Sequence, residues 1–256
     1  MDFRSQVFSL DALSGVAADA LLLVVGGEDA QKGLDPALRA LLADALKAGD
    51  FEAKAGRSLY LHRPGRVKAA RVLFVAAPAA GAKALRVAIA SGIGQLKSLG
   101  VRHVAVAMAG GGAFSAEHAE AVVTAATDAT YTYRDTKPSA PKPPPLSRVT
   151  VLCNKSDAKA VQHGVRRGGA VAAGVSLARA CANRPGNHCT PTYLAEQARK
   201  LGKEHGLKVE VFDRKAVEKI GMGSFLAVAQ GSHEPLRFIV ASRLTPYSRP
   251  HRAKTP

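Results

Sequence analysis

The chain has 256 residues, which is enough for one large domain or two small ones. Its composition, 47% hydrophobic and 22% charged, is that of a globular protein, and no segment approaches the roughly eighteen apolar residues of a membrane-spanning helix. The net charge of +16 favours polyanions such as nucleic acid. The basic residues are nevertheless spread along the chain, so we favour a dispersed basic surface without a dedicated partner.

The N-terminal and cysteine patterns point to a cytoplasmic protein. The first residues, Met-Asp-Phe-Arg-Ser-Gln-Val, lack the basic-then-apolar pattern of a secretion signal. Cys153, Cys181 and Cys189 are odd in number, which argues against a disulfide framework. The interval between the last two is not a zinc-ligand spacing, so we expect structural thiols in a reducing compartment.

Short apolar runs alternate with Ala-rich helical patterns over residues 1–157, which predicts an α/β fold with a mixed, mostly parallel sheet. Continuous apolar runs such as 20–25 are typical of strands buried on both faces. Asp35 and Ser115 are expected to cap helices. The predicted strands are 7–10 (an edge strand), 20–25, 58–62, 71–76, 101–108, 130–133 and 149–153, and the predicted helices are 36–48, 83–99 (closed by Gly100) and 115–126.

Five prolines fall within residues 137–146, which excludes a helix there and disfavours a central strand. Such a segment is typical of a linker between domains. Because an apolar run follows at 149–153, we favour instead a long surface loop that precedes the last strand of the same sheet.

The second half begins with a long helical pattern over 158–182. Thr190 is expected to cap the next helix, with Pro191 in its first turn and Gly206 at its end. Further expected elements are a strand at 208–213, a helix at 214–220, and strands at 226–230 and 237–241.

Three segments resemble the leucyl (cytosol) aminopeptidase family. Residues 182–195 read A-N-R-P-G-N-H-C-T-P-T-Y-L-A and are similar to the family's N-x-P-x-N-x-x-T-P-x-x-L-A. Residues 220–232, I-G-M-G-S-F-L-A-V-A-Q-G-S, resemble L-G-M-G-x-x-L-A-V-x-Q-G-S, and residues 234–240, E-P-L-R-F-I-V, resemble E-P-P-R-L-I-V. The motifs occur in the family's order and spacing, and the resemblance is strong over 158–240 and weaker over 1–157.

The resemblance implies a macro-domain-like, three-layer α/β domain at 1–157, followed at 158–240 by a linker helix and the start of an incomplete α/β catalytic domain. Intact family members are implied to be exopeptidases that use two Mn or Zn ions to release N-terminal amino acids, and to assemble as hexamers. The matched motif residues end helices and turn the chain. We expect Asn183 and Asn187 to bond backbone groups at such a turn.

The residues that would bind the two metals do not occur in this sequence. The family's K-G-x-T-F-D-(S/T)-G-G and N-T-D-A-E-G-R-L patterns, whose Lys, Asp and Glu hold the ions, are both absent. Residues 241–256 are basic, Pro-rich and unlike the family, which suggests a frameshift or premature stop; a genuine divergent tail is the alternative. We therefore predict no catalytic residue, no cofactor-binding residue and no metal ligand in the chain.

Other candidate sites give weaker signals. The eight histidines form no H-E-x-x-H or similar pair, so each is expected to be a surface residue or a helix cap. Gly110, Gly111 and Gly112 follow a predicted strand and could cradle a phosphate, but a plain strand-to-helix turn is favoured. Two alternatives to an inactive aminopeptidase fragment stay open: a binding module for assembly or for nucleic acid, and a poorly stable product with exposed apolar surface.

Overall fold

The computed structural model describes residues 1–78, 81–110 and 113–243. The chain divides into two compact units, Met1–Leu177 and Ala178–Pro256. No helix among the described residues is both long enough and apolar enough to span a lipid bilayer.

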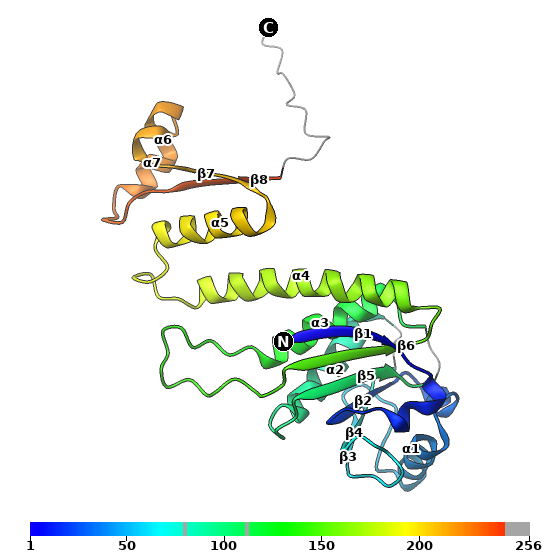
Figure 1. Ribbon diagram of the computed structural model, residues 1–256. Helices are drawn as coiled ribbons and strands as arrows, with labels where there is room; N and C mark the ends of the chain where they lie inside the picture. Colours follow the sequence, from blue (N-terminus) through cyan, green and yellow to red (C-terminus); the bar gives the residue numbers. More distant parts are fainter. Residues whose placement is uncertain (79–80, 111–112, 244–256) are drawn as a thin grey trace. The chain divides into compact units, whose positions relative to one another are not determined.

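The first unit is built on a six-stranded sheet with the order β1-β6-β5-β2-β4-β3 (Figure 1). All neighbouring strands run parallel except β3, which is antiparallel to β4. The predicted mixed, mostly parallel sheet is therefore confirmed. The strands are β1 (Asp2–Val7), β2 (Ala20–Val25), β3 (Ser58–His62), β4 (Arg71–Ala76), β5 (His103–Met108) and β6 (Arg148–Cys153).

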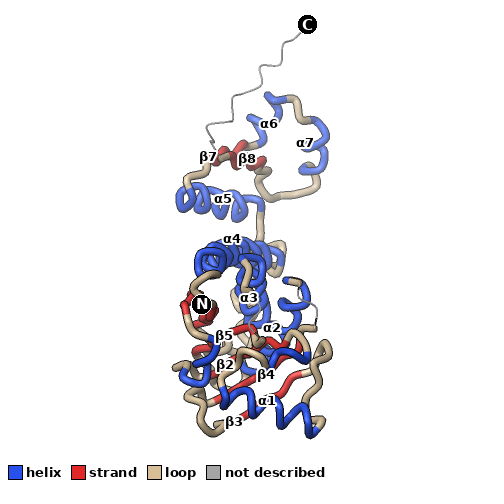
Figure 2. The backbone as a smooth tube through the Cα atoms, turned by 90° about the vertical axis from the view of Figure 1, so that its right-hand side faces the viewer, coloured by secondary structure: helices blue, strands red, loops and turns tan. Residues whose placement is uncertain are grey.

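Helices cover both faces of this sheet and give three layers (Figure 2). Alternate residues of the central strand β2 point to opposite faces, so that Leu22 and Val24 enter one core and Leu21 and Leu23 the other. The first core is closed by α2 (Ala82–Leu96), α3 (Ala116–Thr130) and the start of α4 (Ala158–Ala182). The second is closed by α1 (Pro36–Ala48) and the 3-10 helices η1 (Leu10–Gly15) and η2 (Glu28–Gln31).

Helix α4 packs very closely against α3, and two glycines make this approach possible. A Cβ atom at Gly164 would lie 2.0 Å from the carbonyl oxygen of Ala116, and one at Gly168 would lie 2.9 Å from the Cβ of Val123. Real Cβ atoms do not approach other atoms so closely, so both positions require glycine. The buried α4 residues Val161 and Val165 belong to the same core as the sheet.

Two predicted strands of the first unit are wrong. The edge strand is Asp2–Val7 instead of 7–10, and Leu10 begins η1. The sequence of this strand is largely polar, so no apolar run marks it as a strand. An edge strand need not be apolar on both faces. The predicted strand at 130–133 is also wrong, since α3 continues to Thr130 and the threonine hydroxyls near its end donate to carbonyls of the preceding turn.

The proline-rich segment joins α3 to β6, and β6 pairs with β5 and β1 in the same sheet. The interpretation of this segment as a long loop before the last strand of one sheet is confirmed. Helix α2 ends at Leu96, earlier than predicted, and Gly100 (φ 70°) lies in the turn that follows rather than at the helix cap.

The second unit is smaller and less well packed. It contains α5 (Pro191–His205), β7 (Lys208–Phe212), α6 (Arg214–Ile220), α7 (Gly223–Ala229) and β8 (Phe238–Ser242), and β7 and β8 form an antiparallel two-stranded sheet. The rings of Phe212 and Phe225 each lie 5.7 Å from that of Phe238. Among its described residues the buried apolar side chains are Ala195, Val217 and Leu236.

Candidate functional site

The first family-like motif forms the turn between α4 and α5. Backbone hydrogen bonds fold it tightly: the Arg184 amide donates to the Cys181 carbonyl at 3.2 Å, and the Cys189 amide donates to the Pro185 carbonyl at 2.9 Å. The Thr190 hydroxyl accepts from the Tyr193 amide at 3.2 Å, which confirms the predicted N-cap of α5. The bonds expected of the Asn183 and Asn187 side chains stay a prediction.

The same turn also contains a cation–π contact. The Arg184 guanidinium lies 4.8 Å from the centre of the Tyr193 ring, within the range of a cation–π interaction. This contact joins the turn to the first turn of α5. The backbone bonds and the ring contact of the motif therefore stabilise the turn that leads into α5.

The second motif joins two short helices. Gly221 adopts φ 84° and ends α6, and Met222 then precedes α7. The strand predicted at 226–230 is wrong, because Gly223–Ala229 is helical. Leu and Ala favour helices, and a short apolar run does not by itself distinguish a strand from a buried helix.

Among the described residues, no histidine belongs to a cluster that could hold a metal ion. His118 completes a capping box with Ser115 at the start of α3, so the predicted capping role is confirmed for it. His103 instead lies half-buried on β5, where its Nε2 atom lies 2.9 Å from the Thr150 hydroxyl. Burial, reinforced by the Arg148 charge, lowers the pKa of His103, which favours the neutral ring.

The donor chemistry of the described residues does not fit a two-metal centre. Over residues 1–78, 81–110 and 113–243, no three His, Cys, Asp or Glu side chains come together in a way that could hold a metal ion. A two-metal site needs several such ligands converging on one place.

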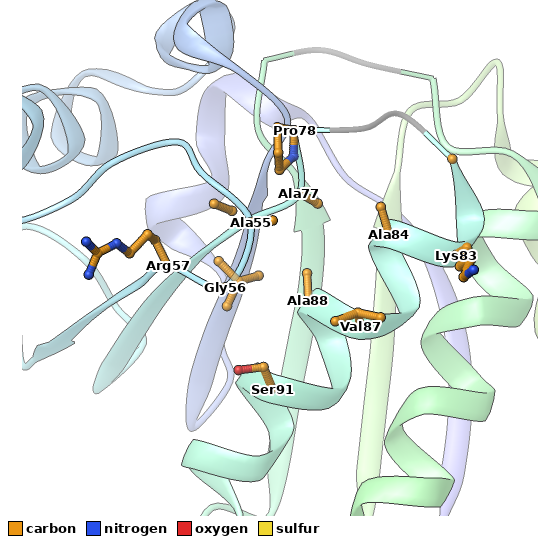
Figure 3. Close-up of a pocket in the computed structure, with 13 residues that line it drawn as sticks. Ala55, Gly56, Arg57, Ala77, Pro78, Lys83, Ala84, Val87, Ala88 and Ser91 are labelled. Atoms are coloured by element: carbon orange, nitrogen blue, oxygen red, sulfur yellow. The ribbon is translucent and has the colours of Figure 1, made fainter.

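A cavity of about 450 Å³ lies in the first unit, between the carboxyl end of β4 and the first turns of α2 (Figure 3). Its walls are mainly the side chains of Ala77, Ala84, Val87 and Ala88. Figure 3 shows Arg57 and Lys83 at opposite margins of the cavity. The cavity suits an apolar group and brings together no acid–base pair.

Sequence reasoning did not single out this cavity. Its walls come from the segment before β3, from the end of β4 and the residues after it, and from α2, and many of them are small apolar residues without a chemical signature. Gly110 adopts φ 87°, as a tight turn requires, whereas residues 111–112 lie outside the described residues.

Solved structures share this arrangement of elements. The chain is similar to a mutant of tomato leucine aminopeptidase over 97% of its own length and 52% of that chain, with a TM-score of 0.79 and 24% identity. It is also similar to the bottromycin maturation enzyme BotP in complex with Mn, over 90% of this chain and 46% of that one, with a TM-score of 0.67 and 24% identity. At this identity the likeness shows the fold.

Sequence relatives give the family. The model for the N-terminal domain of the cytosol aminopeptidase family matches residues 15–139, and the model for the catalytic domain of the same family matches residues 176–253. The chain belongs to the cytosol aminopeptidase family. It is 60% identical over 240 residues to the probable cytosol aminopeptidase of Methylibium petroleiphilum, and 40% identical over 240 residues to that of Polaromonas sp..

The chain spans about half the length of the curated relatives that it matches. The two alignments cover 94% of this chain but 49% and 46% of the relatives. The catalytic-domain match extends past Val240, into residues that we expected to be unlike the family. The origin of residues 241–256 stays a prediction, and residues 244–256 lie outside the described residues.

Proposed function

We propose that the chain is the N-terminal portion of an aminopeptidase-family protein and does not hydrolyse peptides by itself. In this proposal residues 1–157 form the family's N-terminal domain and residues 158–240 begin its catalytic domain. The observation that carries the proposal is in the sequence: both patterns that resemblance assigns to metal binding are missing from the 256 residues. Without their Lys, Asp and Glu side chains, no pair of ions can activate water beside a peptide carbonyl.

The packing of the second unit supports the view that it is part of a larger fold. Helix α7 has an apolar sequence but no buried residue, and the side chain of Val228 is 86% exposed. Ile220 at the end of α6 is 53% exposed. A two-stranded sheet with so small a core is marginal alone, so this apolar surface is suited to covering by further strands and helices.

Peptidase assays of the purified chain test the proposal directly. With leucine p-nitroanilide and added Mn²⁺ or Zn²⁺, we expect no turnover above the background of buffer and metal. The complete Methylibium petroleiphilum relative serves as the positive control. Turnover by the purified chain, or two equivalents of Mn or Zn retained after gel filtration, contradicts the proposal.

A complementation assay tests whether the exposed apolar surface of the second unit binds the rest of a catalytic domain. The part of the Methylibium petroleiphilum relative that follows its aligned 240 residues is co-expressed with this chain. If the apolar surface of the second unit accepts that part, the two polypeptides co-purify and hydrolyse the substrate together. Val228→Lys is expected to abolish the co-purification, whereas the exposed Val87→Lys in the first unit leaves it unchanged.

The net charge of +16 favours a second candidate, a binding module for nucleic acid. Binding through phosphate contacts is independent of base sequence and weakens steeply as salt rises. A gel shift with duplex DNA at low and at physiological salt is the test. No shift at low salt eliminates this candidate. The family's hexameric assembly likewise remains a proposal for this chain, and analytical ultracentrifugation measures it.

A further inference from the structure

Strand β3 is one of the two outer strands of the six-stranded sheet (Figure 1). Among the described strands it pairs only with β4, from Ser58 opposite Val75 to His62 opposite Arg71. The other edge of β3 therefore has no described strand beside it. Such an edge carries backbone N–H and C=O groups that can pair with another polypeptide.

The hydrogen bonds at the two ends of β3 show which of its backbone groups face β4. The Ala76 amide donates to the Arg57 carbonyl at 2.9 Å, and the Arg63 amide donates to the Ala70 carbonyl at 2.7 Å. Successive residues of a strand direct their N–H and C=O groups alternately to its two edges. The odd-numbered residues of β3 therefore bond to β4, and the even-numbered residues face the free edge.

Three residues of β3, Ser58, Tyr60 and His62, direct their backbone groups to this free edge. The described part of the chain supplies no hydrogen-bond partner for these amides and carbonyls. The Tyr60 side chain is 38% exposed, whereas Leu59 and Leu61 on the opposite face are partly buried against the second core. An added strand would thus find unpaired backbone groups and apolar side chains on both faces.

Positive charge flanks the free edge at both ends. Arg57 directly precedes β3, Arg63 directly follows it, and both are exposed. Residues 53–70 contain no Asp or Glu, and no ion pair joins either arginine to an acid among the described residues. The preceding acid, Glu52, pairs with Lys54 at 3.1 Å. An acidic partner would therefore be attracted to both ends of this edge.

The opposite outer strand, β1, differs in its charges. Asp2 lies 2.6 Å from the Arg4 guanidinium and 3.6 Å from that of Arg148, so positive and negative groups are paired there. Charge alone therefore gives β1 no preference for an acidic partner, and β3 is the better candidate of the two.

We propose that the free edge of β3 binds an extended acidic peptide segment, which joins the sheet as an added strand. The backbone of the segment pairs with the outward amides and carbonyls of Ser58, Tyr60 and His62, and its acidic ends lie opposite Arg57 and Arg63. This inference does not depend on the proposed function, because the site uses no metal and no residue of the family-like motifs.

Two other occupants fit the edge less well. Nucleic acid would be attracted by the charge but has no backbone of alternating N–H and C=O groups to pair with the strand. A second copy of β3, paired antiparallel about Tyr60, would place Arg57 opposite Arg63 of the other copy. Like charges directly opposite each other destabilise a strand pair.

Fluorescence anisotropy of labelled peptides with the full chain tests the preference for acid. The probe is E-E-V-T-V-T-V-E-E, and its matched control is K-K-V-T-V-T-V-K-K. We expect the acidic peptide to bind with a Kd below about 1 mM and at least about tenfold more tightly than the basic one. Binding should weaken as salt rises. Failure of the acidic peptide to bind at low salt, or equal binding of the two peptides, overturns the proposal.

Backbone methylation of the acidic peptide tests strand pairing separately from charge. One derivative carries N-methyl groups on the three valines and the other on the two threonines. Only one of these sets faces β3, so one derivative should bind at least about tenfold more weakly while the other binds nearly as the parent peptide does. If neither derivative is weakened and duplex DNA displaces the peptide, the edge binds polyanions without pairing and the proposal is wrong.

Variants of the chain locate the site. The Tyr60 amide faces away from β4, so Y60P is expected to keep the fold and to lose at least about fivefold in affinity, whereas Y60A retains the amide and binds nearly normally. R57E should weaken binding, and K142E, in the exposed proline-rich loop, should not. Unchanged affinity of both Y60P and R57E overturns the proposal. If Y60P fails to fold, the methylated peptides still decide with the parent chain.

Discussion

Asp35 shows how one side chain organises a larger region. It is 3% exposed, and its carboxylate accepts hydrogen bonds from the amides of Ala37 and Leu38 at 3.1 Å and from the amide of Ser14 at 2.8 Å. The first two bonds cap α1, and the third joins α1 to η1. The cap could be predicted from the Asp–Pro pair, but the bond to Ser14 could not, because it spans distant parts of the sequence.

Replacing Asp35 by alanine is expected to lower the free energy of unfolding by about 1–3 kcal/mol, since one buried and two partly buried amides lose their acceptor. Urea denaturation followed by circular dichroism measures the change. Asp35→Asn retains one acceptor oxygen and should cost less. Equal losses for the two variants would show that the hydrogen bonds are not the cause.

Gly164 gives a second prediction at this scale. An added Cβ would collide with the backbone of α3, so Gly164→Ala is expected to reduce stability by about 1–3 kcal/mol. Gly174 lies on the same helix and has no atom within 4 Å of an added Cβ. Gly174→Ala should therefore be neutral or raise stability by up to about 1 kcal/mol, through helix propensity alone. Urea denaturation of both variants separates packing from propensity.

His103 predicts a dependence of stability on pH. Its pKa is lowered in the folded chain by burial and by Arg148, against an opposing effect of Asp19. Below the ordinary pKa of 6.5 the unfolded chain therefore binds a proton more readily than the folded chain, so stability falls as the pH drops from 6.5 through the lower folded pKa. His103→Gln should flatten this part of the pH profile measured by urea denaturation. An unchanged slope would contradict the assignment.

The helices, strands and caps that were predicted correctly from the sequence are those that a local residue pattern determines. The buried strands 20–25 and 71–76, the helices 36–48 and 158–182, and the caps Asp35, Ser115 and Thr190 agree with the structure. The errors fall where local preference and tertiary context disagree. The polar segment β1 is a strand because its backbone pairs with β6. The apolar segment of α7 is a helix, although none of its residues is buried.

The same distinction applies to the candidate sites. The helix cap at Thr190 and the turn after Ala182 could be predicted because their signals are local. The alanine-lined cavity beside α2 could not, since three separated segments form it.

Helix α4 is expected to be required by the first unit. Val161, Val165 and Ala172 are buried in the core that α2 and α3 share with the sheet. A chain ending at Leu177 should therefore unfold at nearly the same temperature as the first unit of the full chain, whereas one ending at Asp157 should unfold at a lower temperature and expose apolar surface. Thermal unfolding and gel filtration of the two fragments make the comparison. If both fragments are equally stable, α4 contributes nothing to the core.

At the scale of the whole molecule, the two units differ in how completely they fold. The first has two cores around a six-stranded sheet, and the second has a two-stranded sheet and an exposed apolar helix. The first unit therefore has the features of an independent domain. The second unit buries only three apolar side chains among its described residues and leaves α7 exposed.

The exposed helix α7 predicts the behaviour of the chain in solution. Val228→Lys should reduce concentration-dependent self-association and leave the free energy of unfolding nearly unchanged, because the side chain is 86% exposed. Light scattering over a range of concentrations measures the association. Val217 is fully buried, so Val217→Lys should instead unfold the second unit. If the Val228→Lys variant self-associates as much as the parent chain, the surface that mediates association is not α7.

The pairing of β1 has a consequence for how the protein is made. Among the described strands, β1 is hydrogen-bonded only to β6, from Asp2 opposite Arg148 to Val7 opposite Cys153. On a ribosome, β1 must therefore wait until almost 150 later residues have been synthesised before its partner exists. The other strands can assemble during that delay, so docking of β1 should be among the last steps in the co-translational folding of this sheet.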